Sequence, residues 1–360
     1  MRALRVRLRD FRSYERAAAD LGDGLTVVLG PNGAGKTNLL EGVYFALTAR
    51  SCRTSNEREL VRHGARLTRA EAEVEADDGV HLLEVGFQPG EPKHLRVDGA
   101  PAERFGPDAP RPLLVVFLPE RLELVRGGPS LRRAHLDRFA AALHPALADL
   151  RARYARALAQ RNALVARGAA SLLDPWDAEL AGVGWELMQA RRQAAATLAE
   201  PFARLSSELG MSEPAELAYR PRSQAGDAEA LRAELHERHA ADVERGFTAH
   251  GPHRDELALA HGGRALRTYG SQGQQRIALL ALLLAERKVL LERHDRAPLM
   301  LLDDVMSELD AERRLRLAEL LRGGGQALVT ATEAEHVPGA GEPGVATIHV
   351  DAGALAGAAV

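Results

Sequence analysis

One stretch, residues 30–37, limits most strongly what this chain can fold into. It reads Gly-Pro-Asn-Gly-Ala-Gly-Lys-Thr and fits the pattern G-x-x-x-x-G-K-[S/T]. Backbone that wraps around a phosphate must point successive N–H groups inward, and glycine reaches the necessary φ and ψ angles without a Cβ clash. The pattern therefore predicts a nucleotide-binding loop.

The residues on either side of this loop support the same prediction. Residues 25–29 have the apolar, β-branched character of a buried strand, and residues 38–47 have the pattern of a helix. A helix that begins at the loop adds unpaired N–H donors and partial positive charge where a phosphate would sit. Lysine is rare in this chain, and Lys36 stands where a slim point charge must reach the phosphates. A glycine-rich turn that binds no nucleotide is the alternative.

Charge and cysteine content narrow the remaining possibilities. A net charge of −3 excludes a uniformly basic coat for nucleic acid, so any DNA contact has to come from a local patch. The N-terminal arginines offer such a patch, although a solvated strand face explains them equally well; they are Arg2, Arg5, Arg7, Arg9, Arg12 and Arg16. Cys52 is the only cysteine, which excludes an intrachain disulfide and fits a reducing compartment. Because no apolar run is long enough to cross a bilayer, we expect a cytoplasmic protein.

The order of the apolar patterns predicts an α/β protein with a helical insertion. Residues 2–11 alternate apolar and basic, and we expect this strand to pair near the one at 25–29. Short strands between 71 and 97 predict an antiparallel meander, and the apolar run 113–117 predicts a buried central strand. The expected division is 1–120 for the N-terminal half of the main domain, 121–248 for the inserted helical domain and 249–360 for the C-terminal half.

A second part of the site is predicted where a buried strand ends in carboxylates. Residues 299–302 are all apolar and are followed by Asp303 and Asp304. Open α/β sheets bind ligands at the carboxyl ends of their strands. Asp303 can therefore hold Mg²⁺ opposite Thr37, and Asp304 can orient or deprotonate the attacking water.

A third part is predicted at residues 270–276. Ser271 and the backbone of Gly273 come at the start of a strongly apolar helix, where they make a second anion site. One nucleotide needs only one phosphate cradle, so the second cradle should serve the nucleotide of another copy across a symmetric dimer. The alternative is an ordinary helix cap, since Ser is common at that position.

Taken together, these segments resemble the ABC-type ATPase heads of the SMC class, and more closely the RecF family of bacterial recombination-repair proteins. The resemblance covers most of the chain. Its most specific segments are the Ser-Gln-Gly-Gln-Gln run at 271–275 and the Ser-Glu-Leu-Asp loop at 307–310. It implies an ABC-type P-loop ATPase head with an antiparallel β meander and an inserted helical domain.

The resemblance also implies a function and a set of site residues. It implies ATP and Mg²⁺ as ligands. It also implies an ATP-dependent homodimer that clamps DNA, either a duplex or a junction between duplex and single strand. It further implies a part in loading RecA at gaps alongside RecO and RecR. Catalysis is expected from Lys36, Asp303 and Asp304, and metal binding from Thr37 and Asp303. The nucleotide-binding set is Gly30, Pro31, Asn32, Gly33, Ala34, Gly35, Lys36, Thr37, Asn38, Ser271, Gln272, Gly273, Arg53 and Arg12.

Two departures from the family pattern affect the expected chemistry. ABC ATPases usually carry Glu where this chain has Asp304, and the shorter side chain predicts slow turnover. The expected activity is a slow, DNA-stimulated ATPase. The sequence after the meander has no convincing glutamine loop. Pro119 and Glu120 occupy the region in which that loop is expected.

Two other classes of protein share part of the pattern. The nucleotide-binding subunit of an ABC transporter has the same motifs, but it normally has a shorter helical insertion and requires a membrane partner. A nucleoside kinase or GTPase shares only residues 30–37 and leaves 270–276 without a purpose.

Overall fold

The computed structural model describes residues 1–106 and 109–356, which divide into two compact units. The first unit combines residues 1–121 with the chain from Glu286 onward, and the second is 122–285. Among the described residues, no helix is both long and apolar enough to span a bilayer.

The phosphate loop belongs to a six-stranded sheet of the first unit, with the order β15-β14-β3-β13-β12-β8. Its strands are β3 Leu25–Leu29, β8 Leu114–Phe117, β12 Leu299–Leu302, β13 Ala327–Ala331, β14 Ala346–Asp351 and β15 Ala354–Ala356. All neighbouring pairs are parallel except β14 and β15. The carboxyl ends of β3, β13 and β12 therefore meet at one edge. The prediction of a central strand at 113–117 is wrong, because β8 is the last strand in the order. An apolar run shows that a strand is buried, but it does not show whether the strand lies at the centre or at the edge of the sheet.

A second six-stranded sheet in the same unit is antiparallel and has the order β2-β1-β4-β5-β6-β7. Its strands are β1 Arg2–Phe11, β2 Tyr14–Asp20, β4 Thr68–Ala76, β5 Gly79–Phe87, β6 His94–Val97 and β7 Ala100–Ala102. We call it the meander sheet. The predicted pairing of residues 2–11 near 25–29 is wrong, because β1 pairs with β2 and β4. A tight turn, with Arg12 at a φ of 52°, folds the chain back on itself before it reaches residue 25.

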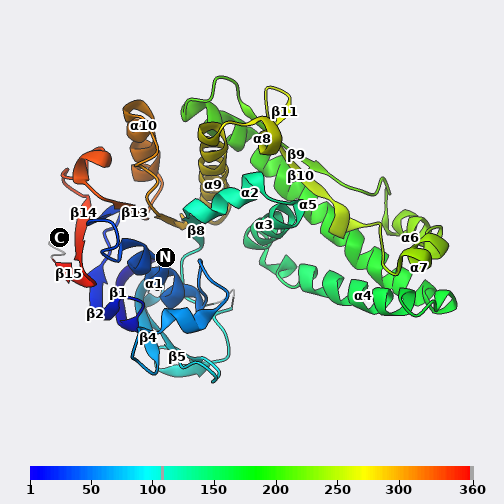
Figure 1. Ribbon diagram of the computed structural model, residues 1–360, viewed down its shortest axis with the longest axis horizontal. Helices are drawn as coiled ribbons and strands as arrows, with labels where there is room; N and C mark the ends of the chain where they lie inside the picture. The colour runs from blue at the N-terminus through cyan, green and yellow to red at the C-terminus, as the bar shows by residue number, and fades with distance from the viewer. Residues whose placement is uncertain (107–108, 357–360) are drawn as a thin grey trace. The chain divides into compact units, whose positions relative to one another are not determined.

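Helix α1, Lys36–Thr48, packs against the meander sheet and also contacts β13 of the parallel sheet (Figure 1). Most of its side chains are buried, and they join one hydrophobic core with β1, β4 and β5. Gly42 permits this close packing, since a Cβ there would lie 2.5 Å from Leu8 Cδ1. The helix that follows the phosphate loop is thus held from both sides, which fixes the position of the loop. This unit also contains α10, Ala311–Arg322, and the end of α9, Gln272–His294.

The second unit is mainly helical and has a small three-stranded sheet of order β11-β10-β9. Its helices are α2 Glu123–Arg126, α3 Pro129–Leu143, α4 Leu150–Val165, α5 Asp174–Glu208, α6 Ala228–His236, α7 His239–Arg245 and α8 Leu266–Tyr269, and α9 Gln272–His294 begins in this unit. Its strands are β9 Ala215–Arg220, β10 Glu256–His261 and β11 Arg264–Ala265. The sequence-based division returned to the main domain at residue 249. In the structure β10 pairs with β9, so residues 249–285 pack with the helical unit.

Candidate functional site

The phosphate loop leaves β3 at Leu29 and enters α1 at Lys36. Gly33 and Gly35 have φ angles of 81° and 119°, which side chains with a Cβ rarely adopt. Tyr14 is fully buried and donates a hydrogen bond to the Gly35 carbonyl at 2.9 Å. It therefore supports the loop from beneath. Pro31, Asn32 and Gly33 are exposed at the tip, whereas Ala34 is buried.

Lys36 folds back over this loop. Its ammonium group donates to the carbonyl oxygens of Gly30 at 2.7 Å and Pro31 at 3.0 Å. Burial lowers the pKa of Lys36, and the negative charges of Asp304 and Asp303 oppose that shift. The only partners of the ammonium group that we find among the described residues are thus weakly basic carbonyls and distant carboxylates. A phosphate oxygen would be a stronger acceptor.

The strand-end carboxylate contacts the first turn of α1. Thr37 Oγ1 lies 2.9 Å from both oxygens of Asp303, although the two residues are far apart in the chain. The hydroxyl of Thr330, at the end of β13, donates to Asp303 Oδ1 at 2.8 Å. Burial raises the pKa of Asp303, and the hydrogen bonds from Thr330 and Thr37 partly offset this. A hydroxyl and a carboxylate side by side are the oxygen ligands that Mg²⁺ uses beside a nucleotide.

Asp304 differs from Asp303 in the exposure of its side chain and in its backbone conformation. Its side chain is exposed, and its backbone has a φ of 47°, which is uncommon for a residue with a Cβ. The Asp304 N–H donates to Thr330 Oγ1 at 2.8 Å, which holds this backbone in place. The backbone therefore holds its Cα fixed and leaves its carboxylate open to water.

A buried carboxylate that the sequence reasoning missed organises the next layer. Glu41 is fully buried in α1 and accepts two hydrogen bonds from Arg12, at 2.8 and 3.0 Å. Arg53 donates to Glu41 at 3.3 Å and to the Asn38 side chain at 3.1 Å, and Asn38 in turn donates to Ser13 at 3.0 Å. The structure thus brings Arg53 and Asn38 together beside the loop and fixes Arg12 on Glu41. A charged residue inside the apolar run 39–47 was the available signal.

The 270–276 stretch, described within its own unit, begins α9. Ser271 Oγ accepts from the Gln274 N–H at 3.2 Å, and the Gln274 side chain accepts from the Ser271 N–H at 2.8 Å. This reciprocal pair is a capping box. Ser271, Gln272 and Gly273 are exposed, and a Cβ at Gly273 would meet nothing within 4 Å. The Ser271 hydroxyl serves as a helix cap here, and the residues around it are exposed to solvent.

Gln275 shows how this exposed turn is anchored. Its side chain is buried, accepts from Arg126 Nε at 2.6 Å and donates to the Leu266 carbonyl at 2.8 Å. The second predicted loop, 307–310, has the same character in the first unit. Asp310 caps α10 by accepting from the Arg313 N–H at 2.9 Å, while Ser307 is exposed.

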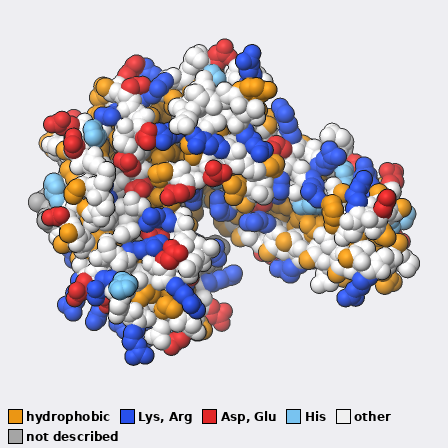
Figure 2. All heavy atoms as spheres, in the orientation of Figure 1, with side chains coloured by type: hydrophobic (Ala, Val, Ile, Leu, Met, Phe, Trp, Pro, Cys, Tyr) orange, Lys and Arg blue, Asp and Glu red, His pale blue; other side chains and the backbone are white. Residues whose placement is uncertain are grey.

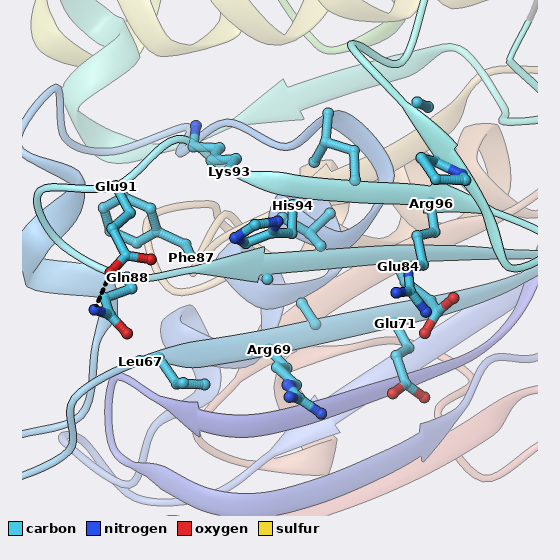
Figure 3. Close-up of a pocket in the computed structure, with 16 residues that line it drawn as sticks. Leu67, Arg69, Glu71, Glu84, Phe87, Gln88, Glu91, Lys93, His94 and Arg96 are labelled. Carbon is cyan, nitrogen blue, oxygen red and sulfur yellow. Dashed lines mark hydrogen bonds between the residues drawn. The ribbon is translucent and has the colours of Figure 1, made fainter.

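Hollows on the meander sheet lie apart from the phosphate loop. One of about 550 Å³ is lined by side chains of β4, β5 and β6, including Arg69, Glu84 and His94 (Figure 3). Another, of about 380 Å³, is lined by β1, β2 and β4, and Arg69 borders both. Neither contains a residue predicted to bind nucleotide. Across the face shown in Figure 2 positive and negative side chains are interspersed, as expected for a net charge near zero.

Comparisons with known proteins agree with this geometry. Residues 5–88 match the family described as AAA domain. A DNA replication and repair protein RecF from Streptomyces avermitilis is 39% identical over 94% of this chain and 95% of its own length. One from an Anaeromyxobacter species is 38% identical over 98% of both chains.

Solved structures also match this chain over nearly its whole length. The chain matches a structure described as the recombination mediator protein RecF-ATP in the RecFOR pathway with a TM-score of 0.87 and 28% identity, covering 99% of this chain and 98% of that one. An Smc head bound to the C-terminal winged-helix domain of ScpA matches with a TM-score of 0.60 at 15% identity, which supports the fold alone. The predicted fold class, an ABC-type ATPase head, is confirmed.

Proposed function

The chain belongs to the RecF family of DNA replication and repair proteins, and on that premise we propose that it is an ATP-driven homodimeric DNA clamp. One observation carries the nucleotide part of the proposal. Thr37, in the first turn of α1, meets Asp303, at the end of β12, with 2.9 Å between the hydroxyl and each carboxylate oxygen. Burying a carboxylate costs free energy that an apolar side chain would avoid, so a carboxylate at this position favours a functional role. A metal ion beside a nucleotide is such a role.

In the proposed cycle, side chains of this chain exchange internal partners for ligand atoms. The Lys36 ammonium leaves the Gly30 and Pro31 carbonyls for phosphate oxygens, while the N–H groups of residues 33–37 surround the phosphate. Thr37 and Asp303 would hold Mg²⁺, which neutralises phosphate charge when it is bound. Asn38 and Arg53 lie beside this position and are available to the nucleotide.

Hydrolysis needs a group that orients or deprotonates water, and Asp304 is the proposed one. It follows the metal-site carboxylate directly, and its side chain is exposed. Aspartate reaches one methylene less far than glutamate. We therefore expect turnover to be slow. We also propose that DNA stimulates it and that the energy serves to release the clamp.

The dimer part of the proposal is supported by the exposure of Ser271, Gln272 and Gly273. A phosphate cradle whose donors face solvent is available to a second copy. In this proposal the Ser271 hydroxyl gives up the Gln274 N–H and donates to the γ-phosphate held by the partner. The loop from Ser307 to Asp310, in which only Leu309 is buried, would then connect the two composite sites.

The N-terminal arginines divide into two groups that suggest where DNA binds. Arg2, Arg5, Arg7 and Arg12 are all ion-paired with carboxylates. Of the ion pairs between described residues, none involves Arg9, Arg16 or Arg69.

These three unpaired arginines form a row across the meander sheet. Arg9 on β1 lies directly opposite Arg16 on β2 and Arg69 on β4. All three are exposed. Like charges directly opposite on neighbouring strands repel and destabilise a sheet. Phosphates of a DNA backbone would relieve that repulsion, so we assign this arginine row as a DNA contact.

The part played by this chain in repair also follows from the family. RecO and RecR are its proposed partners, and RecA loading at gaps is the proposed outcome, since the matched solved structures are described in the RecFOR pathway. A transporter subunit is not favoured, because the matched relatives are DNA replication and repair proteins over nearly their full length.

Sedimentation velocity with and without ATP and a gapped DNA duplex tests this proposal. ATP should convert the protein from monomer to dimer, and the dimer should co-sediment with DNA. A protein that binds ATP and remains monomeric, or that dimerises without affinity for DNA, would contradict the clamp.

A further inference from the structure

Four side chains with metal-binding atoms meet in the helical unit, away from the residues considered so far. Asp174 and Asp177 lie in the first turn of α5, while His236 ends α6 and His239 begins α7. One ligand atom from each lies within 4.8 Å of all the others. Asp174 and Asp177 are three residues apart in one helix, so their side chains lie on the same face. The turn between α6 and α7 brings the rings of His236 and His239 to 4.6 Å between centroids.

The types of ligand indicate which ion would fit. Imidazole nitrogen suits Zn²⁺ and its transition-metal neighbours, whereas Mg²⁺ and Ca²⁺ prefer oxygen alone. Two nitrogens and two carboxylate oxygens make a complete tetrahedral set. Ligand atoms around zinc lie roughly 3.4 Å apart, given metal–ligand distances near 2.1 Å. Small rotations of Asp174 and His236, whose side chains are 59% and 65% exposed, would bring the set to that size.

The contacts within the cluster bring its ligand atoms together. Asp177 bonds to His239, and Asp174 to His236 at 3.1 Å. The centroids of the two imidazole rings lie only 4.6 Å apart. The hydrogen-bonded group contains three carboxylates, Asp174, Asp177 and Asp242, and one guanidinium, that of Arg161. A cation at the cluster would offset this excess of carboxylates.

Arg161 also fixes the most buried ligand. It is fully buried on α4, and its Nε donates to Asp177 Oδ1 at 2.7 Å. Its NH1 donates to Asp242 and to Thr248 Oγ1, both at 2.7 Å. This arrangement leaves Asp177 Oδ2 directed at His239 and supplies the hydrogen-bonded support that ligating carboxylates need.

We propose that Asp174, Asp177, His236 and His239 bind one zinc-class divalent ion. The ion would join the start of α5 to the turn between α6 and α7, segments about sixty residues apart in the chain. Its role would be structural, because it would stabilise the packing of these helices.

Isothermal titration of the full-length chain with ZnCl₂ tests the proposal. The wild type should bind one Zn²⁺ per chain at this site, and millimolar MgCl₂ should not compete. His236→Gln, at an exposed position that the fold tolerates, should weaken Zn²⁺ binding by at least about 100-fold. CoCl₂ should give the visible absorption of tetrahedral Co²⁺ with the wild type, and His236→Gln should abolish it.

A matched control separates this site from general binding by His and Asp. His81 also bonds to two carboxylates, Asp78 and Asp98, but among the described residues we find no ring contact between it and a second imidazole. His81→Gln should keep the Zn²⁺ affinity and the Co²⁺ spectrum unchanged. Loss of binding in His81→Gln, unchanged binding in His236→Gln, or displacement of Zn²⁺ by Mg²⁺ would overturn the assignment.

Discussion

The phosphate loop and the 270–276 stretch are both proposed anion sites at the start of a helix, yet they are built differently. Lys36 is buried and bonded to loop carbonyls, and Thr37 is bonded to Asp303. Ser271 and Gly273 are exposed, and Ser271 bonds only within its own turn in the contacts found here. The first site is largely preformed and needs a ligand; the second is an open surface. This difference is what a site shared between two copies requires.

The largest expected effect is on the preformed site. Lys36→Met removes the only side-chain cation that we assign to the phosphates, so ATP binding should fall at least about 100-fold. Fluorescent-nucleotide titration measures this. Lys288→Met, which removes an exposed lysine paired with Glu292, is the control and should bind normally. Wild-type affinity in Lys36→Met would mean that the loop is not the nucleotide site.

Ser271→Arg should separate the two regions. Bulk and charge at an open surface leave the phosphate loop intact, so the variant should bind ATP with wild-type affinity and yet remain monomeric by light scattering. Ser271→Ala is the matched control for loss of the helix cap, which costs about 1 kcal/mol of stability. An ATP-dependent dimer of Ser271→Arg at wild-type concentration would refute the shared site.

Asp303→Asn should bind nucleotide within a few-fold of wild type but hydrolyse it about 100-fold more slowly, because a metal ligand loses its charge. A wild-type steady-state rate would contradict the metal role.

The same substitution should stabilise the nucleotide-free protein. Burial raises the pKa of Asp303 in the folded state, so above that pKa the folded protein holds a buried charge that unfolding releases to water. Asp303→Asn should therefore raise the melting temperature at pH 7, and the gain should vanish as pH falls below the unfolded pKa of about 3.9. Asp304→Asn, at the exposed neighbour, should change the melting temperature little. An equal effect of both would show that burial of Asp303 is not the cause.

The smallest effects are expected on DNA binding. Arg9→Ala and Arg69→Ala should each weaken binding several-fold and lower the salt dependence of affinity by about 0.9 per contact. Arg5→Ala is the control, since Arg5 is already paired with Asp20. If Arg5→Ala costs as much as Arg9→Ala, the arginine row has no special role.

The sequence was most informative where local pattern decides the structure. Residues 30–37 and 299–303 each carry their own strand or helix context, and the structure brings Thr37 and Asp303 together as the strand-end argument expects. The order of the strands was harder to predict from the sequence, because it depends on pairing between segments far apart in the chain. The turn at Arg12 that returns β2 to β1, and the pairing of β9 with β10 inside the helical unit, leave little local signal. Glu41 was missed because its partners Arg12 and Arg53 lie in loops.

The specific ATPase activity of the wild-type protein over a dilution series tests the shared site most directly. If each site is completed by Ser271 of a second copy, activity per chain should rise with protein concentration and level off once dimers form. A constant activity per chain down to concentrations at which the protein sediments as a monomer with ATP would contradict the account.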